Sequence, residues 1–216
     1  KFMENSRVCD TNNQEDLRAC MKVLRAFHNQ NIQVKHIFDL YGQLEYYEKL
    51  WNGRKSIYQD YELTKKHILS LRSFVEGNAK RKTLTHIDAV PDNFMIQALG
   101  NGKQDIRLID WEYAGMADPL LDIAMGAIYS YMDFQEAKGL LEDYLLAAEG
   151  EKVAEPLLLH GRTKEQLEKL LIAYMGLSGL LWSLWCAYKM RKGQEFGEYS
   201  LKMLRYFKEA KKTLGL

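Results

Sequence analysis

The amino-acid sequence predicts a mainly α-helical fold with a small β-hairpin near the middle of the chain. Two observations support this fold class. Apolar residues recur at helical spacing through the first third of the chain and again after Pro119. Between Thr83 and Trp111 this pattern gives way to short apolar runs, which are typical of strands. A chain of 216 residues can bury one sizeable core, so we expect one domain or one large lobe of a longer protein.

The first third of the chain has the pattern of three helices. Residues 15–29 follow two residues that can cap a helix, Asn12 and Asn13, and they place an apolar stripe on one face: Leu17, Cys20, Met21, Leu24 and Phe27. The spacing recurs over residues 37–51 and 58–75, where the inner faces hold Leu40, Leu44, Tyr47, Tyr61, Ile68, Leu71 and Phe74. We therefore expect three helices with one buried face each.

The middle of the chain predicts the hairpin. Residues 93–99 and 106–111 are short apolar runs, and between them lies the pair Asn101-Gly102, which favours a tight hairpin turn. A shorter run, residues 83–86, precedes both. We expect these runs to form a small β element.

Helices return after the hairpin. Pro119 suits the first turn of a helix, and Asp118 can cap it. Thr163 and Gln166 have the spacing of a capping box. The expected helices span residues 120–131, 134–148, 163–191 and 198–212.

Charge and cysteine content restrict the possible partners. The 30 basic and 29 acidic residues leave a net charge of +1, and no arginine-rich tract is present, so nucleic acid is not an expected partner. The chain has three cysteines: Cys9, Cys20 and Cys186. An odd number of cysteines without metal-ligand spacing is typical of reduced thiols in the cytoplasm. The chain starts at Lys1 without an initiator methionine, so we expect a preceding segment.

One segment, residues 170–188, is apolar and long enough to raise the alternative of a membrane span. It carries no charged residue and lies between Lys169 and Lys189. Its glycine, serine and tyrosine residues dilute its hydrophobicity, and the segments on both sides are amphipathic, as in a globular helical protein. We therefore expect a buried core helix, with membrane contact as the weaker alternative.

Three oxygen-bearing side chains follow the predicted strands. Asp88 and Asn93 lie between the first short run and the hairpin, and Asp110 lies at the end of the hairpin. If the strand ends are neighbours, two carboxylates and an amide oxygen converge, which is the set that phosphoryl transfer with magnesium requires. Asp and Asn are also ordinary turn residues, so a solvated loop stays open as an alternative.

The order of three motifs resembles a known family. The loop H-x-D-x-x-x-x-N carries His86, Asp88 and Asn93, and it is followed by IDWE and then by DPxxDIA, which begins at Asp118 and includes Asp122. This order is similar to that of the aminoglycoside phosphotransferase and choline kinase family. The segments IDWEYAG and GLLWSLW are most similar to the corresponding segments of bacterial choline kinases.

The resemblance implies a protein-kinase-like carboxyl-terminal lobe and a role for each motif residue. Asp88 would position or deprotonate the substrate hydroxyl, while Asn93 and Asp110 would hold Mg²⁺. His86 and Asp122 would brace the loop.

Trp182 and Trp185 lie three residues apart, so their rings project from one face of the expected long helix. A tryptophan pair on an apolar helix is most often core packing, and this alternative stays open. Choline kinases have a similar W-x-x-W pair, and by resemblance the two rings would enclose a quaternary ammonium group with Tyr113, while Glu112 adds negative charge. Animal choline kinases have an acidic residue near the position of Tyr129, so this cage is expected to be more aromatic and less charged.

The function implied by the resemblance is transfer of the γ-phosphoryl group of ATP to the hydroxyl of choline, with ATP and Mg²⁺ as cofactors. Kinases also need a glycine-rich loop and a lysine over the phosphates, yet no glycine precedes Gly42. We therefore expect residues 1–216 to be the catalytic and substrate-binding lobe, inactive alone, with a nucleotide-binding lobe upstream. Two alternatives stay open: a kinase for ethanolamine, an aminoglycoside or another amino alcohol, and a non-catalytic module that binds a trimethylammonium group.

Overall fold

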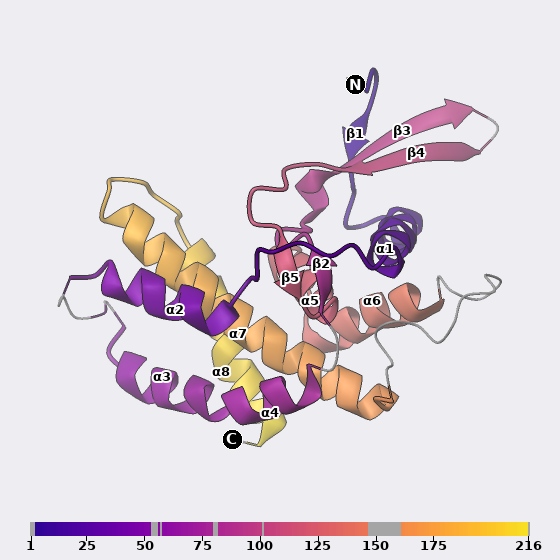
Figure 1. Ribbon diagram of the computed structural model, residues 1–216. Coiled ribbons are helices and arrows are strands. Elements are labelled where there is room, and N and C mark those ends of the chain that lie inside the picture. Colours follow the sequence, from indigo (N-terminus) through magenta and orange to yellow (C-terminus); the bar gives the residue numbers. More distant parts are fainter. Residues whose placement is uncertain are drawn as a thin grey trace.

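The computed structural model of the chain describes residues 3–52, 56, 58–79, 82–100, 102–146 and 161–215. It confirms the predicted fold class, because over these residues the chain is mainly helical with two small antiparallel sheets (Figure 1). The predictions for the turn residue Asn101 and for the helix end at residues 147–148 lie outside the described residues.

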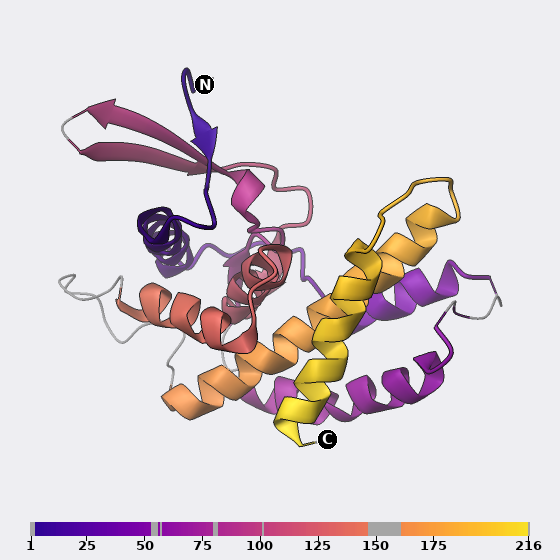
Figure 2. The same cartoon turned by 180° about the vertical axis from the view of Figure 1, so that it is seen from behind.

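A long helix, α7 (Lys164–Met190), organises one half of the molecule. Figure 2 shows α8 lying along it, and Gly176 and Gly179 leave room for this contact. A Cβ atom on Gly179 would stand 2.5 Å from the carbonyl oxygen of Met203, so only glycine allows the two backbones to approach this closely. The other helices of this half are α2 (Leu40–Lys49), α3 (Tyr61–Ser70), α4 (Arg72–Asn78) and α8 (Tyr199–Leu214).

The other half holds the first helix and the hairpin. Helix α1 (Gln14–Asn29) begins after the predicted cap Asn13 and packs against α6 (Phe134–Leu146). The predicted hairpin forms, and a two-residue strand near the start of the chain pairs with it. The order in this sheet is β1 (Arg7–Val8), β3 (Phe94–Gly100), β4 (Lys103–Leu108).

Helix α5 (Leu120–Tyr129) joins the two halves, because it contacts both α6 and α7. Asp118 lies one residue before the cap position of α5, and its Oδ1 accepts a hydrogen bond from the first helical amide at 2.9 Å. Its other oxygen accepts from Arg162 at 2.7 Å in a buried ion pair. The predicted capping box of Thr163 and Gln166 is present at the start of α7.

A second sheet, which the sequence did not predict, positions the motif loops. Strand β2 (Thr83–Thr85) pairs antiparallel with β5 (Gly115–Ala117), and Thr85 lies opposite Gly115. The loop that follows β2 and the loop that precedes β5 therefore meet at the same end of this sheet. This pairing brings His86 next to the residues that follow the hairpin.

The single helix predicted over residues 58–75 is wrong, because the structure has two helices that meet at Leu71. The Ser70 hydroxyl donates to the carbonyl of His67 at 2.6 Å, and the amide of Leu71 bonds to Ile68 instead of His67. A serine side chain that competes for a helical carbonyl in this way interrupts the regular ladder.

Within the described residues, α7 is the one helix long and apolar enough to cross a membrane by length and composition. Of its most apolar window, 89% is buried inside the fold. The neighbouring helices α2, α5 and α8 cover it, which is the environment of a core helix.

Candidate active site

The motif loop between β2 and β3 is held in place by His86. Its Nε2 donates a hydrogen bond to the carbonyl oxygen of Ile109 at 2.8 Å, which ties this loop to the end of the hairpin. The ring also packs edge-on against Trp111, with the ring centres 4.6 Å apart. The Nδ1 atom is buried and has no hydrogen-bond partner among the described residues. One ring nitrogen of His86 is hydrogen-bonded and the other is buried away from solvent. This arrangement suits a residue that holds the loop in place.

Asp122 on α5 holds the backbone of the same loop. Its carboxylate accepts hydrogen bonds from the amides of His86 at 2.8 Å and Ile87 at 2.6 Å. Ile87 has a φ of +72°, a left-handed conformation that costs a β-branched residue on the order of 1–3 kcal/mol. Hydrogen bonds to a buried carboxylate are strong enough to offset this strain. Asp122 therefore imposes the turn that directs Asp88.

Asp88 and Asn93 lie side by side after that turn. The amide nitrogen of Asn93 donates to the backbone carbonyl of Asp88 at 2.8 Å and to its carboxylate at 3.1 Å. Both bonds use the nitrogen, so the amide oxygen of Asn93 is the atom left to bind a cation.

Asp110 follows Ile109, whose backbone amide donates to the carbonyl of Asn93 at 3.0 Å. Burial raises the pKa of Asp88 above its usual value, and the negative charges of Asp110 and Glu112 raise the pKa further. The ring of His86 and the hydrogen bond from Asn93 oppose this shift. Asp110 is exposed and has a φ of +64°. The strand ends that carry Asn93 and Asp110 are therefore neighbours, while the convergence of the Asp88, Asn93 and Asp110 side chains and their chemical roles stay predictions.

The donor set fits magnesium better than a metal held by the protein alone. Nowhere in the part of the chain that the structure describes do three or more His, Cys, Asp or Glu side chains gather as a metal cluster. Mg²⁺ characteristically takes one or two carboxylates and completes its shell with water and substrate phosphates. The amide of Asn93 and the carboxylate of Asp110 match that pattern.

The predicted tryptophan pair forms part of a corner of three rings, which we call the aromatic corner: Tyr113, Trp182 and Trp185. The ring centres of Trp182 and Trp185 are 5.8 Å apart at 87°, and those of Trp182 and Tyr113 are 6.0 Å apart at 84°. All three side chains are half-buried. The indole nitrogen of Trp182 donates to the sulfur of Met125 at 3.1 Å, which fixes this ring on α5.

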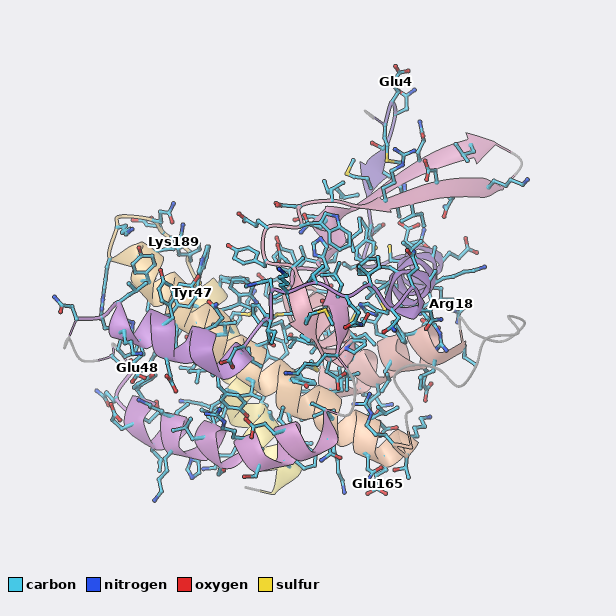
Figure 3. All side chains as sticks on the ribbon, in the orientation of Figure 1. Glu4, Arg18, Tyr47, Glu48, Glu165 and Lys189 are labelled. Atoms are coloured by element: carbon cyan, nitrogen blue, oxygen red, sulfur yellow. The ribbon has the colours of Figure 1, made fainter. Side chains whose placement is uncertain are left out.

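Tyr47 of α2 is half-buried against the core, as its stripe predicted, and its ring centre lies 6.1 Å from that of Tyr188 on α7. Burial raises the pKa of Tyr113 to about 12, and Glu112 and Tyr47 contribute to the same shift. Burial also raises the pKa of Tyr47, to which Glu112 again contributes. Figure 3 shows Tyr47 and Lys189 at the same end of the helical half. The negative charge of Glu112 therefore acts on both Tyr47 and Tyr113, which no sequence spacing could reveal.

Tyr129 lies beside a carboxylate of the motif loop. Its hydroxyl donates to the carboxylate of Asp92 at 3.0 Å, and both residues line a hollow of about 690 Å³ beside the loop. Burial raises the pKa of Tyr129 to about 12, and Asp92 and Asp88 add to the shift. The sequence missed Asp92 as the partner of Tyr129, and the expectation of a more aromatic and less charged cage stays a prediction.

Comparison with known proteins agrees with the fold and the motifs. The phosphotransferase enzyme family (APH) matches residues 7–175, which is most of the chain. The chain therefore belongs to the aminoglycoside phosphotransferase and choline kinase family, as the order of its motifs predicted.

Within this family the chain is similar to proteins called LicA. It is 29% identical to protein LicA of Haemophilus influenzae over 94% of this chain and 73% of that sequence, and a second H. influenzae LicA gives the same identity over 58% of its length. Its fold is similar to that of choline kinase LicA from Streptococcus pneumoniae, with a TM-score of 0.76, 26% identity, and coverage of 100% of this chain and 69% of that one. A structure of LicA in complex with AMP gives a TM-score of 0.75 at 25% identity, over 100% of this chain and 67% of that chain. The chain thus spans between 58% and 73% of these relatives.

Proposed function

We propose that the protein to which this chain belongs transfers the γ-phosphoryl group of ATP to the hydroxyl of choline. The observation that carries the proposal is the position of one loop, residues 109–114. It carries Asp110, whose negative charge raises the pKa of Asp88, and three residues later Tyr113, whose ring lies against Trp182. A phosphoryl-transfer centre and an aromatic corner are thereby held a few residues apart, as a small cationic alcohol requires.

Each residue of the site has its own role in the proposed reaction. The choline oxygen attacks the γ-phosphorus, the bond to the β-γ bridging oxygen breaks, and ADP leaves. Asp88 accepts the hydrogen bond of the attacking hydroxyl and takes its proton. Asn93 and Asp110 would hold Mg²⁺, which neutralises charge on the phosphates when it is bound.

The aromatic corner supplies the selectivity. A trimethylammonium group donates no hydrogen bonds, so aromatic faces and a nearby negative charge are the groups that can bind it. Tyr113, Trp182 and Trp185 offer the faces, and Glu112 offers the charge.

The chain supplies only part of this machinery in our proposal. We assign residues 1–216 to the carboxyl-terminal lobe, and a separate nucleotide-binding lobe of the same protein would cover the triphosphate. The fold shared with AMP-bound LicA supports a nucleotide as the phosphoryl donor. Free, buried thiols at Cys9, Cys20 and Cys186 suit the cytoplasm, where ATP is available.

The test uses the full-length protein with Mg-ATP and follows phosphocholine by ³¹P NMR. We expect kcat/KM for choline to exceed that for ethanolamine, because ethanolamine lacks the methyl groups that aromatic faces contact. Higher kcat/KM for ethanolamine or an aminoglycoside would move the substrate to another amino alcohol. Choline binding without turnover by intact protein would instead identify a binding module.

A further inference from the structure

A buried hydrogen-bond chain connects the motif loop to helix α6. His28, the second-last residue of α1, is fully buried. Its Nε2 lies 3.0 Å from the carboxylate of Asp122, and its Nδ1 lies 2.8 Å from the hydroxyl of Tyr144. Neither His28 nor Tyr144 belongs to the motifs that define the site. The chain therefore runs from Tyr144 through His28 and Asp122 to the amides of residues 86 and 87.

The chemistry of each partner determines where the protons lie. A carboxylate accepts hydrogen bonds only, so the Nε2 of His28 must carry a hydrogen to bond with Asp122. A neutral imidazole then has an unprotonated Nδ1, which needs a donor. Burial raises the pKa of Tyr144 above its usual value, so its hydroxyl keeps its proton and can donate to that nitrogen.

Tyr144 is itself held in one position. The guanidinium of Arg25 donates to the backbone carbonyl of Tyr144 at 2.7 Å and to that of Leu145 at 2.9 Å. It also lies over the Tyr144 ring, 5.5 Å from the ring centre. The hydroxyl of Tyr144 therefore faces His28 from a fixed backbone.

We propose that His28 and Tyr144 are positioning residues for the phosphoryl transfer: Tyr144 holds the imidazole ring in the orientation that donates to Asp122, and Asp122 in turn fixes the turn that directs Asp88. This inference rests on the proposed function. In this proposal, the geometry of the motif loop depends on Tyr144, which is linked to the loop through two residues, His28 and Asp122.

The strained turn makes the loop sensitive to this chain. Ile87 keeps its left-handed conformation because Asp122 bonds its amide and that of His86. Without the hydroxyl of Tyr144, the Nδ1 of His28 is a buried polar atom without a partner, which costs free energy and leaves one side of the ring unanchored. A ring that is held on one side only keeps Nε2 less firmly directed at the carboxylate, so Asp122 holds the loop less firmly.

Three variants of the full-length protein test the proposal against one matched control. Tyr144→Phe removes the donor, His28→Leu removes the whole link, and His28→Gln keeps an N–H that can reach Asp122. Tyr206→Phe is the control, because its buried hydroxyl donates to the carbonyl of Met132 at 2.9 Å, outside the chain of bonds. Thermal unfolding identifies the variants that stay folded.

Two measurements decide the outcome. In steady-state kinetics with choline, we expect kcat to fall about tenfold for Tyr144→Phe and about 100-fold for His28→Leu with unchanged choline KM, because small misplacement of a catalytic group has costs of this size. His28→Gln should recover part of the loss. Hydrogen–deuterium exchange should be faster at residues 86–88 in Tyr144→Phe and His28→Leu, and unchanged there in Tyr206→Phe.

The two readouts also separate this inference from the proposed function. If the unmodified protein phosphorylates no amino alcohol, the proposed function fails, and exchange at residues 86–88 alone decides whether Tyr144 orders the loop. If the unmodified protein is active but Tyr144→Phe matches Tyr206→Phe in kcat and in exchange, the positioning role is refuted. A loss in His28→Gln equal to that in His28→Leu would show that the donor to Asp122 is unimportant and would refute it too.

Discussion

Replacing Trp182 by alanine tests whether the aromatic corner binds a cation or only fills the core. The Trp182 ring stands at right angles to both Tyr113 and Trp185, so its removal takes away the shared wall. A cation over a desolvated aromatic face gains about 2 kcal/mol, and over an exposed face about half to one. Since Trp182 is half-buried and tenfold in affinity corresponds to about 1.4 kcal/mol, we expect the choline KM to rise at least tenfold and at most by about 30-fold from this contact alone.

The assay compares side chains that a cage and a core would rank differently. Trp182→Phe keeps an aromatic face and should recover part of the affinity, whereas Trp182→Leu keeps apolar volume and should not. Trp51→Leu is the matched control, because Trp51 is buried and packs against Tyr61, with the ring centres 4.8 Å apart. It should lower the unfolding temperature and leave the choline KM unchanged.

Calorimetry with choline and its neutral isostere 3,3-dimethylbutanol adds a direct comparison. An aromatic corner with Glu112 nearby should prefer the cation, because the two ligands have the same shape and differ in charge. Equal binding of the two ligands, or an unchanged choline KM in folded Trp182→Ala, would refute the assignment of the corner as the choline site.

Further predictions concern the phosphoryl-transfer residues and the packing of α7. Asp88→Asn should lower kcat by ~10²–10⁴-fold with little change in choline KM, because it removes the proton acceptor; unchanged turnover would refute this role. Since the pKa of Asp88 is raised, its ionisation destabilises the fold as pH rises through that pKa, so the same variant should unfold at a higher temperature at pH 7, and a lower one would contradict the reasoning. Asp110→Asn should raise the Mg²⁺ concentration needed for half-maximal rate, and it should move the acid limb of kcat/KM to lower pH by removing a charge that raises the pKa of Asp88; an unchanged limb would show that the two carboxylates do not interact. Gly179→Ala should destabilise the fold by about 1–3 kcal/mol through its clash with Met203, whereas Gly139→Ala, which meets nothing within 4 Å, should stabilise α6 by roughly 0.5–1 kcal/mol; equal unfolding temperatures would refute the packing argument.

The helices of this protein could be predicted where a single local sequence pattern marked the helix or its first residue. The apolar stripe and Asn13 marked α1, and the capping box of Thr163 and Gln166 marked the start of α7. The break at Leu71 was not predictable from periodicity, because it depends on which carbonyl the Ser70 hydroxyl reaches. A propensity argument treats such a serine as a neutral helix residue.

Short strands and buried pairings were harder to predict. Strands β1 and β5 have two and three residues, too few to show an alternating pattern, and their partners lie far away along the chain. The meeting of the motif loop with the end of the hairpin, seen in the bond between His86 and Ile109, could be expected once strand ends were assumed to be neighbours. The contacts of His28 and Tyr47 could not be predicted, because each residue lies on a helical stripe where an ordinary core residue would fit the same pattern.

The unbroken length of α7 has a consequence for how this pocket can change. The helix has 27 residues, which corresponds to about 40 Å, and Trp182 lies three residues after the glycine that receives α8. Inserting one residue between Gly179 and Trp182 would rotate both indole rings by about 100° about the axis relative to the glycines that receive α8, and away from Tyr113. Substitutions in α7, or changes in the loop that carries Tyr113, avoid this rotation. Relatives that prefer different alcohols should therefore differ in side chains along an α7 of constant length, because helical phase forbids insertions there.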